Sequence, residues 1–310
     1  MVSFIILNYN SSRLAGKCVD SIKAFLPLGS YEIIVVDNGS RVEEYTLLDK
    51  LADDTCQVVR KEQNTGFGTG NMVGASVARG DYLCFLNSDV VLVEDCVTPL
   101  CRYMTEHLDV GCITPVQQKV DGRRSRSFRH DSGIWHELVG DGIREKLFPQ
   151  RFPPRDSILK ESTEPVSVMQ INGSFMLFPT DKFWAIGGFD TSIFLYYEEY
   201  DLAKRLQLKG WKRVVHPQYT FLHVHDASTS AMRRQALKEN FVSKIYTYRK
   251  YHGLVSTFLF RSIIALQLMV KPRKWYVLPA VLGGNPLRHS MRYQADFGKD
   301  VHIEPCSARN

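Results

Sequence analysis

Three acidic side chains fall within four residues, at Glu198, Glu199 and Asp201. Acids are favourable near the N-terminus of a helix, so one role of this cluster is to stabilise a helix that begins there. The cluster follows the aromatic run Phe194–Tyr197, which we expect to be partly buried. Carboxylates crowded against an apolar wall have raised pKa values, which suits a general base. We therefore favour catalysis over helix capping for this cluster.

A further acid, Asp89, closes the sequence Asn87-Ser88-Asp89 after an apolar run. A carboxylate at the end of a buried strand can bind Mg²⁺ or Mn²⁺ together with a diphosphate, because both ions prefer oxygen ligands. A turn or helix-capping Asp is the simpler alternative. His223 and His225 lie two residues apart, so on a strand they share one face. One of them could complete a metal site begun by Asp89, although a surface histidine is the default.

Glycines recur in the segment Asn64–Asn71, whose sequence is NTGFGTGN. Glycines at a helix start let the backbone approach phosphate or sugar, although close packing of a helix on a sheet is the alternative. No frame supplies the third glycine of a G-x-G-x-x-G fingerprint, so we set a dinucleotide site aside. Asp37 follows another apolar run. It can accept a hydrogen bond from the imide N–H of uracil or thymine, or it can end the strand in a turn.

These residues lie at the ends of predicted secondary-structure elements. Apolar runs at Val2–Leu7, Glu32–Val36 and Tyr82–Leu86 alternate with helical patterns at Arg13–Phe25 and Gly66–Arg79. This alternation predicts an α/β fold with a mostly parallel sheet covered on both faces. Ligands of such sheets bind beyond the carboxyl ends of the strands, so the polar clusters there should converge on one pocket. The three clusters are Asn8-Tyr9-Asn10, Asp37-Asn38 and Asn87-Ser88-Asp89.

The second half of the chain is less regular. Residues 117–165 are rich in Arg, Asp, Gly and Pro with little periodicity, and we expect a long loop there. Regular structure should resume at Val166–Phe178, and a helix over about 198–209 should end at Gly210. A strand at Lys212–His216 and a separate segment over 219–225 should follow.

The C-terminal region has a helical pattern interrupted at Pro272 and Pro279. Net charge is +6, and residues 233–292 hold twelve Lys and Arg against one acid, Glu239. This basic, aromatic-rich region could face anionic lipid or nucleic acid. A solvated helical surface is the plainer alternative.

Composition excludes several classes of protein. The seven cysteines are odd in number and contain no C-x-x-C pair, so neither a disulfide framework nor a zinc ribbon is indicated. Reduced thiols of a cytoplasmic protein fit better. We expect no secretory leader before the first apolar run. We also expect no segment long and apolar enough to cross a bilayer, since the nearest, Leu254–Val270, contains Arg261.

Seven motifs, in this order and spacing, resemble the family 2 glycosyltransferases of bacterial polysaccharide assembly, whose nucleotide-binding fold is called GT-A. The chain looks most similar to the rhamnosyltransferase-type members. The resemblance runs from Ser3 to about Thr229. The motifs are IILNYN at 5–10, IIVVDNGS at 33–40, NTGFGTGN at 64–71, FLNSDV at 85–90, INGSFMLFP at 171–179, GGFDTSIFLYYEEYDLAKRLQLKGW at 187–211 and HVHDAST at 223–229.

The resemblance implies a role for each matching position. Asp37 would contact the nucleobase, and Asp89 would carry most of the metal binding, because Asn87 replaces the first Asp of the family's D-x-D motif. Glu199 stands where the family has its catalytic carboxylate, usually an Asp, with Glu198 and Asp201 as electrostatic and structural neighbours. Asp201 could also cap the helix. The implied nucleotide-sugar-binding residues are Asn8, Tyr9, Asp37, Asn38, Asn64, Gly66, Phe67, Asn71, Asn87, Ser88, Gly173 and Trp211, and the implied metal ligands are Asp89 with His223 or His225.

The implied reaction is an inverting transfer of a sugar from a nucleotide donor, assisted by Mg²⁺ or Mn²⁺. The donor expected first is dTDP-rhamnose, with a UDP-hexose or a galactofuranose donor as the alternative. The acceptor would be a saccharide or a polyprenyl-diphosphate-linked saccharide at the inner face of the cytoplasmic membrane. The C-terminal region would make peripheral membrane contact, and no nucleic acid partner is expected. Arg205, or an arginine of residues 123–129, could add positive charge near the diphosphate.

The resemblance also implies a division of the chain. Residues 1–230 would form the GT-A domain, with a nucleotide-binding half over about 1–115 and an acceptor-side half over about 116–230. Residues 231–310 would form the basic helical extension, and residues 295–310 have no assigned role. Two alternatives remain, a nucleotidyltransferase and a catalytically inactive sugar-nucleotide-binding protein.

Overall fold

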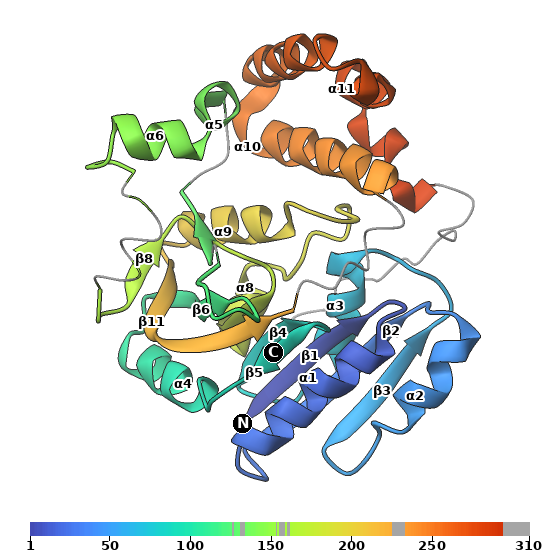
Figure 1. The fold of residues 1–310 in the computed structure, drawn as a ribbon, viewed down its shortest axis with the longest axis vertical. Helices are drawn as coiled ribbons and strands as arrows, with labels where there is room; N and C mark the ends of the chain where they lie inside the picture. The colour runs from blue at the N-terminus through green and yellow to red at the C-terminus, as the bar shows by residue number, and fades with distance from the viewer. Residues whose placement is uncertain are drawn as a thin grey trace.

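The computed structural model describes residues 1–125, 127–130, 134–152, 154, 159, 162–224 and 233–293. Its centre is a mixed sheet with helices on both faces, and a helical C-terminal part stands above the sheet (Figure 1). Within the described residues this sheet has nine strands, in the order β3-β2-β1-β4-β10-β6-β11-β5, with β8 paired to β11. The predicted α/β class with a mostly parallel sheet in its first half is confirmed.

The first four strands are parallel. β1 (Val2–Asn8) lies between β2 (Tyr31–Asn38) and β4 (Tyr82–Asn87), and β3 (Cys56–Lys61) pairs with β2. The three predicted strands are therefore confirmed to within one or two residues. All four strands run the same way, so their carboxyl ends meet at one edge.

Helices cover both faces of this sheet, because successive side chains of β1 point in opposite directions. Phe4 and Ile6 pack in one core with α1 and α4, whereas Ile5 packs in a second core with α3, α8 and α9. The bounds are α1 Ser12–Phe25, η1 Val42–Glu44, α2 Tyr45–Asp49, α3 Phe67–Val77, α4 Val97–Glu106, α8 Thr180–Ala185 and α9 Glu198–Leu208. Gly210 has φ +76° directly after α9, as expected of the residue that ends a helix.

The second half of the sheet is mixed. β10 (Phe175–Pro179) runs antiparallel to β4 and β6 (Val110–Gln118), and β11 (Lys212–His223) runs parallel to β6. We expected a strand and a separate segment over 212–225, but β11 is one strand with a register shift between His216 and Thr220. β5 (Val90–Leu92) and β8 (Val166–Val168) pair antiparallel with β11.

The stretch 117–165 contains more regular structure than the predicted loop. β7 (Phe128–Arg129) pairs with β9 (Gln170–Ile171), and two short helices follow, α5 (Ile134–Val139) and α6 (Asp141–Leu147). The sequence pattern did not reveal these helices, because they are too short to show a helical period.

The C-terminal part has a core of its own, in which Ile245, Phe260 and Val281 are fully buried or nearly so. Its long helix α10 (Arg233–Met269) is interrupted by Gly253, which has φ +70°. The expected interruptions at Pro272 and Pro279 are confirmed, because α10 ends at Met269 and each proline lies in the first turn of a new element, where a missing backbone N–H costs nothing. The elements that follow α10 are η2 (Pro272–Val277), α11 (Leu278–Leu282), η3 (Pro286–His289) and η4 (Met291–Tyr293).

The expectation of no membrane-length segment is corrected. Among the described residues, the helix Arg234–Met269 is long and apolar enough to cross a bilayer, judged by length and composition alone. Only 22% of its most apolar stretch is buried inside the protein. Gly253 divides this helix, so the apolar half begins at Leu254.

Candidate active site

Polar side chains at the ends of β1 and β2 contact one another. Asn8 Nδ2 lies 3.3 Å from Asp37 Oδ1 and 3.1 Å from Ser40 Oγ, and all three residues are buried. Asp37 Oδ2 makes no hydrogen bond within the described part of the chain and lies 3.7 Å from Nε of Arg60. This oxygen is the acceptor that an imide N–H could use. Because the carboxyl is fully buried, a nucleobase reaches it only when the side chains above it move.

The ends of β1 and β4 are also in contact. Ser11 Oγ donates to Asn8 Oδ1 at 3.0 Å and lies 2.9 Å from Ser88 Oγ. The Ser11 side chain makes no capping hydrogen bond to α1 and links strand ends instead. The backbone N–H of Asn87 donates to the carbonyl of Ser174 at 3.0 Å, which brings Gly173 to the same edge. The three polar clusters therefore converge, as predicted.

Asn38 holds the glycine-rich segment in place. Its Nδ2 donates to Asn64 Oδ1 at 3.0 Å and to the carbonyl of Gly66 at 3.2 Å. Its Oδ1 accepts from the backbone N–H of Thr65 at 3.2 Å. These contacts use both ends of the amide, so Asn38 shapes the loop that would surround a nucleotide.

Gly66 fixes this segment against the stretch that precedes α9. It has φ +89°, and a Cβ there would lie 2.3 Å from the carbonyl oxygen of Phe194, so only glycine fits. The backbone N–H of Phe67 donates to that same carbonyl at 2.7 Å. Asn71 is buried and donates to the carbonyl of Phe67 at 3.0 Å, so it stabilises the first turn of α3.

Asp89 and His223 are 134 residues apart in sequence, yet Asp89 Oδ1 lies 3.0 Å from His223 Nε2. Asp89 follows β4, His223 ends β11, and the backbone N–H of Val224 donates to the carbonyl of Asp89 at 3.0 Å. The predicted proximity of these two residues is confirmed. His225 and the Ser/Thr cluster after it lie outside the described residues.

The donor set of this pair fits Mg²⁺ or Mn²⁺ bound in part by a substrate. A carboxylate and an imidazole supply one oxygen and one nitrogen, and both side chains are largely buried. The described residues contain no group of three or more His, Cys, Asp or Glu that could hold a metal. Mg²⁺ commonly takes one or two protein carboxylates and completes its shell with phosphate oxygens and waters. With the ligands that the described residues supply, the pair would hold such an ion as a site shared with a diphosphate.

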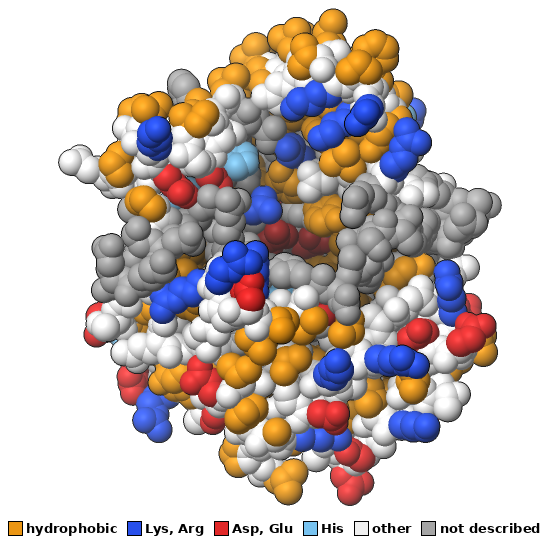
Figure 2. Space-filling model, in the orientation of Figure 1, with side chains coloured by type: hydrophobic (Ala, Val, Ile, Leu, Met, Phe, Trp, Pro, Cys, Tyr) orange, Lys and Arg blue, Asp and Glu red, His pale blue; other side chains and the backbone are white. Residues whose placement is uncertain are grey.

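Glu198 and Glu199 begin α9 after an unusual stretch of backbone. Tyr196 and Tyr197 have φ +68° and +69°, a left-handed conformation that costs free energy in residues other than glycine and is concentrated at functional sites. Glu198 is buried, and burial together with the negative charge of Glu199 raises its pKa well above the usual range. Glu199 is partly exposed. The pair thus combines a buried acid that holds its proton more tightly than usual with a partly exposed carboxyl group. Figure 2 shows this face of the molecule hollowed, with acidic side chains deep in the hollow.

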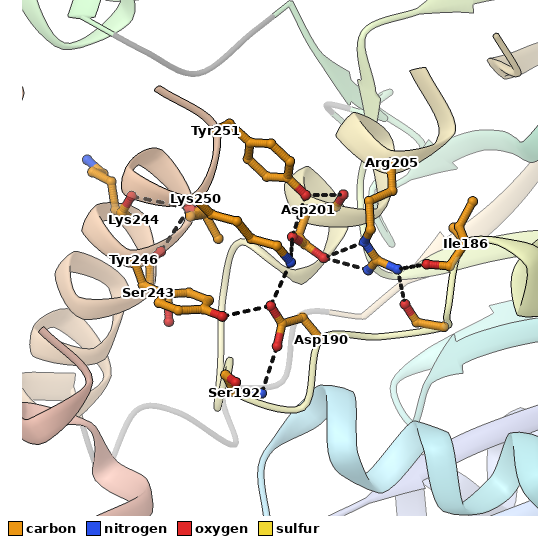
Figure 3. A network of polar contacts seen from close by, with 12 residues as sticks. Ile186, Asp190, Ser192, Asp201, Arg205, Ser243, Lys244, Tyr246, Lys250 and Tyr251 are labelled. Carbon is orange, nitrogen blue, oxygen red and sulfur yellow. Dashed lines mark hydrogen bonds and ion pairs between the residues drawn. The ribbon is translucent and has the colours of Figure 1, made fainter. Parts of the chain in front are cut away.

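Asp201 is the third member of the acidic cluster, and the structure gives it different contacts from those expected. Its side chain does not cap α9. Oδ1 lies 2.6 Å from Nζ of Lys250 and 2.6 Å from the hydroxyl of Tyr251, and Oδ2 accepts from Nε of Arg205 at 2.9 Å (Figure 3). Both oxygens are occupied and the side chain is fully buried. Asp201 therefore joins α9 to α10.

Lys250 was not predicted from the sequence to contact the acidic cluster. Its Nζ also lies 2.7 Å from Asp190 Oδ2, which accepts a second hydrogen bond from the hydroxyl of Tyr246 at 2.9 Å (Figure 3). Ser243 donates to the carbonyl of Leu195 at 2.8 Å. The sequence did carry a sign of such pairing, because residues 233–292 hold twelve Lys and Arg against one acid. It indicated that some of these cations pair with acids outside the region.

Two further expectations are corrected. Arg205 does not face a ligand, because Nη1 donates to the carbonyls of Ile186 and Gly188 while the rest of the guanidinium holds Asp201. Trp211 precedes β11, whose far end holds His223. A strand of that length spans about 36 Å at ~3.3 Å per residue. Trp211 therefore packs at the opposite end of the sheet from the polar edge and cannot line the nucleotide.

Comparison with known proteins places the chain among sugar transferases. A family model described as "Glycosyl transferase family 2" matches residues 3–186. The rhamnosyltransferase WbbL of Escherichia coli K12 is 24% identical over 239 residues, which make up 72% of this chain and 83% of WbbL. N-acetylgalactosaminyltransferase 4 of Drosophila melanogaster is 26% identical over 220 residues, which make up 67% of this chain but only 33% of that protein.

A solved structure with the same fold is the mannosyltransferase PcManGT from Pyrobaculum calidifontis, in complex with GDP-Man and Mn²⁺. It matches with a TM-score of 0.55 at 16% sequence identity. The match covers 91% of this chain and 84% of that one.

Proposed function

Because the chain belongs to glycosyl transferase family 2 and has the GT-A fold, we propose that it transfers a sugar from a nucleotide diphosphate donor to a hydroxyl acceptor with inversion. Asp37 would contact the base, Asp89 and His223 would bind the metal, and Glu199 would be the general base.

One observation supports this proposal most strongly. A line of polar contacts crosses the carboxyl edge of the sheet from β2 to β4: Asp37 to Asn8 at 3.3 Å, Asn8 to Ser11 at 3.0 Å, and Ser11 to Ser88 at 2.9 Å. The next residue, Asp89, contacts His223. The line spans two strand spacings, about 10 Å. That length suits a nucleoside diphosphate with its base near Asp37 and its phosphates near Asp89.

The chemical step is a single displacement. The carboxylate of Glu199 takes the proton of the acceptor hydroxyl, and the acceptor oxygen forms a bond to the anomeric carbon. The bond from that carbon to the diphosphate oxygen breaks on the opposite face, and the nucleoside diphosphate leaves with the electron pair. Glu198 would contribute through its raised pKa, because an acid that holds its proton more tightly is less apt to place a second negative charge beside the base. A general base of this kind contributes about 10²–10⁴-fold to the rate.

Asp89 and His223 are the residues that would hold Mg²⁺ or Mn²⁺. The ion, when bound, would neutralise negative charge on the departing diphosphate.

The donor proposed first is dTDP-rhamnose, with a UDP-hexose or galactofuranose donor as the alternative. The match to the rhamnosyltransferase WbbL over most of its length supports this choice. A donor screen tests it: full-length protein with dTDP-rhamnose and UDP-sugars, with Mg²⁺ or Mn²⁺, measuring the released nucleotide. Release of nucleoside diphosphate supports a glycosyltransferase, whereas release of pyrophosphate would identify a nucleotidyltransferase.

We also propose a lipid-linked acceptor at the cytoplasmic face of the membrane. Figure 2 shows apolar side chains gathered over the C-terminal helices, with Lys and Arg side chains beside them. Such a surface suits the interface of an anionic bilayer. The exposed apolar residues of this part are Leu254, Val255, Phe258, Leu259, Leu266, Met269, Val270, Trp275 and Leu282.

Point substitutions test this membrane contact without removing α10. Val255→Glu with Phe258→Glu should shift the protein from the membrane fraction to the soluble fraction of a lysed cell, because each places a charge on the apolar face. Leu28→Glu, at a similarly exposed apolar position in the turn between α1 and β2, is the matched control. Unchanged membrane binding of the double variant would show that this apolar surface does not contact the membrane.

A further inference from the structure

Two cations from opposite ends of the chain lie against the glycine-rich segment. Lys61 ends β3, and its Nζ donates to Oγ1 of Thr65. Arg292 lies in η4, and its Nη2 donates to Oγ1 of Thr69 at 3.3 Å and to the carbonyl of Thr191. Both threonines belong to the segment 64–71, so the two cations contact the same segment.

Neither cation has a counter-ion in the described part of the chain. Their hydrogen bonds go to hydroxyls and a carbonyl, and Arg292 Nε is buried without a partner there. The two carboxylates whose charges act on Arg292 hold other partners: Asp190 contacts Lys250 and Tyr246, and Glu239 contacts the hydroxyl of Ser290 and the N–H of Met291.

The two cations also repel each other. Burial lowers the pKa of Lys61 to about 8, and the positive charge of Arg292 adds to this effect. Burial likewise lowers the pKa of Arg292. Like charges that are partly removed from water destabilise each other, and an anion bound between them would offset that cost.

This place is separate from the proposed metal pair. The order β3-β2-β1-β4 puts three strand spacings, about 14 Å at ~4.8 Å each, between the end of β3 and the end of β4. Lys61 and Asp89 therefore lie at different places along this edge. Arg292, by contrast, contacts Thr191, which lies in the stretch before α9 and Glu199.

We propose that Lys61 and Arg292, with Thr65 and Thr69, form a second phosphate-binding site beside the glycine-rich segment. A lysine supplies a point charge and an arginine supplies a fork of donors, and both are suited to phosphate oxygens. Two sources share this chemistry, a phosphate of the donor nucleotide and the diphosphate of a prenyl-linked acceptor. The choice between these sources rests on the proposed function, whereas the site itself does not.

Calorimetric titration of the full chain tests the site, in buffer with EDTA so that no cation bridges ligands to Asp89. The probes are inorganic pyrophosphate, dTDP, UDP and geranyl diphosphate. We expect Lys61→Met and Arg292→Met each to weaken pyrophosphate binding about tenfold or more, since a hydrogen bond to a charged group is lost. Lys61→Arg should retain most of the affinity. Lys50→Met and Arg288→Met are matched controls that remove an exposed cation from the same regions.

The pattern across the probes identifies the source. Weakened binding of dTDP or UDP assigns the site to the donor, and weakened binding of geranyl diphosphate alone assigns it to the acceptor. Unchanged binding of every probe in two folded variants, judged by their melting temperatures, would overturn the proposal. These titrations do not measure sugar transfer. The phosphate site can therefore be present even if the proposed function is wrong, and the proposed function can be right even if the site is absent.

Discussion

Nζ of Lys250 lies 2.6 Å from Oδ1 of Asp201, and this contact joins the C-terminal helix α10 to the helix that begins with Glu198 and Glu199. The same Nζ holds Asp190 at 2.7 Å, in the stretch before α9. The C-terminal part is therefore connected to the proposed catalytic helix and is not merely an appendage. Deleting residues after about 240 would remove Lys250 as well as the apolar surface, so such a truncation could not isolate membrane binding.

Lys250→Met should lower both stability and turnover. Asp201 is fully buried and would lose a charged partner, which costs about 1–3 kcal/mol. We expect a lower melting temperature and a reduced kcat, with nucleotide affinity nearly unchanged because Lys250 does not contact the strand-end cluster. Lys250→Arg should restore part of the activity. Arg249→Met removes the neighbouring exposed cation and serves as the control. A Lys250→Met enzyme with normal kcat would show that this contact does not position α9.

Gly66→Ala should weaken nucleotide binding. The added Cβ would meet the carbonyl of Phe194 at 2.3 Å, at a φ of +89°. Either the strand-end loop or the stretch before α9 must then move, at a cost of about 1–3 kcal/mol. Gly142→Ala is the matched control, since nothing lies within 4 Å of its Cβ. Equal nucleotide affinity and melting temperature in the two variants would contradict the close approach at Gly66.

The strand-end part of the site could be predicted from sequence, because its geometry follows from local pattern. Three apolar runs predicted parallel strands, and parallel strands bring Asn8, Asp37 and Asp89 to one edge. The pairing of Asp89 with His223 followed from the resemblance to known motifs. The prediction that Trp211 lines the nucleotide was wrong for a physical reason. Trp211 shares a sequence motif with Glu199, but α9 lies between them, so Trp211 lies at the other end of the sheet.

The contacts of Asp201 could not be predicted, because they depend on tertiary packing. A carboxylate near a helix N-terminus has the same local pattern whether it caps the helix or pairs with a distant cation. Lys250 lies 49 residues away from Asp201, and no local periodicity connects the two. The short helices α5 and α6 were missed for a related reason, since six or seven residues give too little period to recognise.

Glu198→Gln should change how stability depends on pH. The pKa of Glu198 is raised in the folded protein, so the fold keeps a proton that the unfolded chain releases above its ordinary pKa. Stability is then lost as pH rises from the ordinary glutamate range toward the folded pKa. Glutamine does not ionise, so the Glu198→Gln variant does not lose stability in this way as pH rises. The melting temperature of the variant, relative to the parent, should therefore increase as pH rises above the ordinary glutamate range. A difference independent of pH would show that Glu198 ionises normally.

Asp89→Asn and His223→Ala should each weaken the response to metal. Chelation with EDTA should stop nucleoside diphosphate release by the parent protein, and added Mn²⁺ or Mg²⁺ should restore it. Each variant should need more Mn²⁺, by about 10-fold or more, since one ligand of a shared site is lost. Asp95→Asn, an acidic position beside α4, is the control. Release that persists in EDTA would exclude a metal-dependent mechanism.

Glu199 is proposed as the base of a sugar transfer, and a paired measurement on Glu199→Gln tests this role. Turnover is measured as nucleoside diphosphate release from the best donor of the screen in the presence of its acceptor, and nucleotide affinity is measured by calorimetry on the same preparation. We predict turnover at least about 100-fold lower with nucleotide affinity within about twofold of the parent. Turnover of Glu199→Gln equal to that of the parent would show that Glu199 is not the general base.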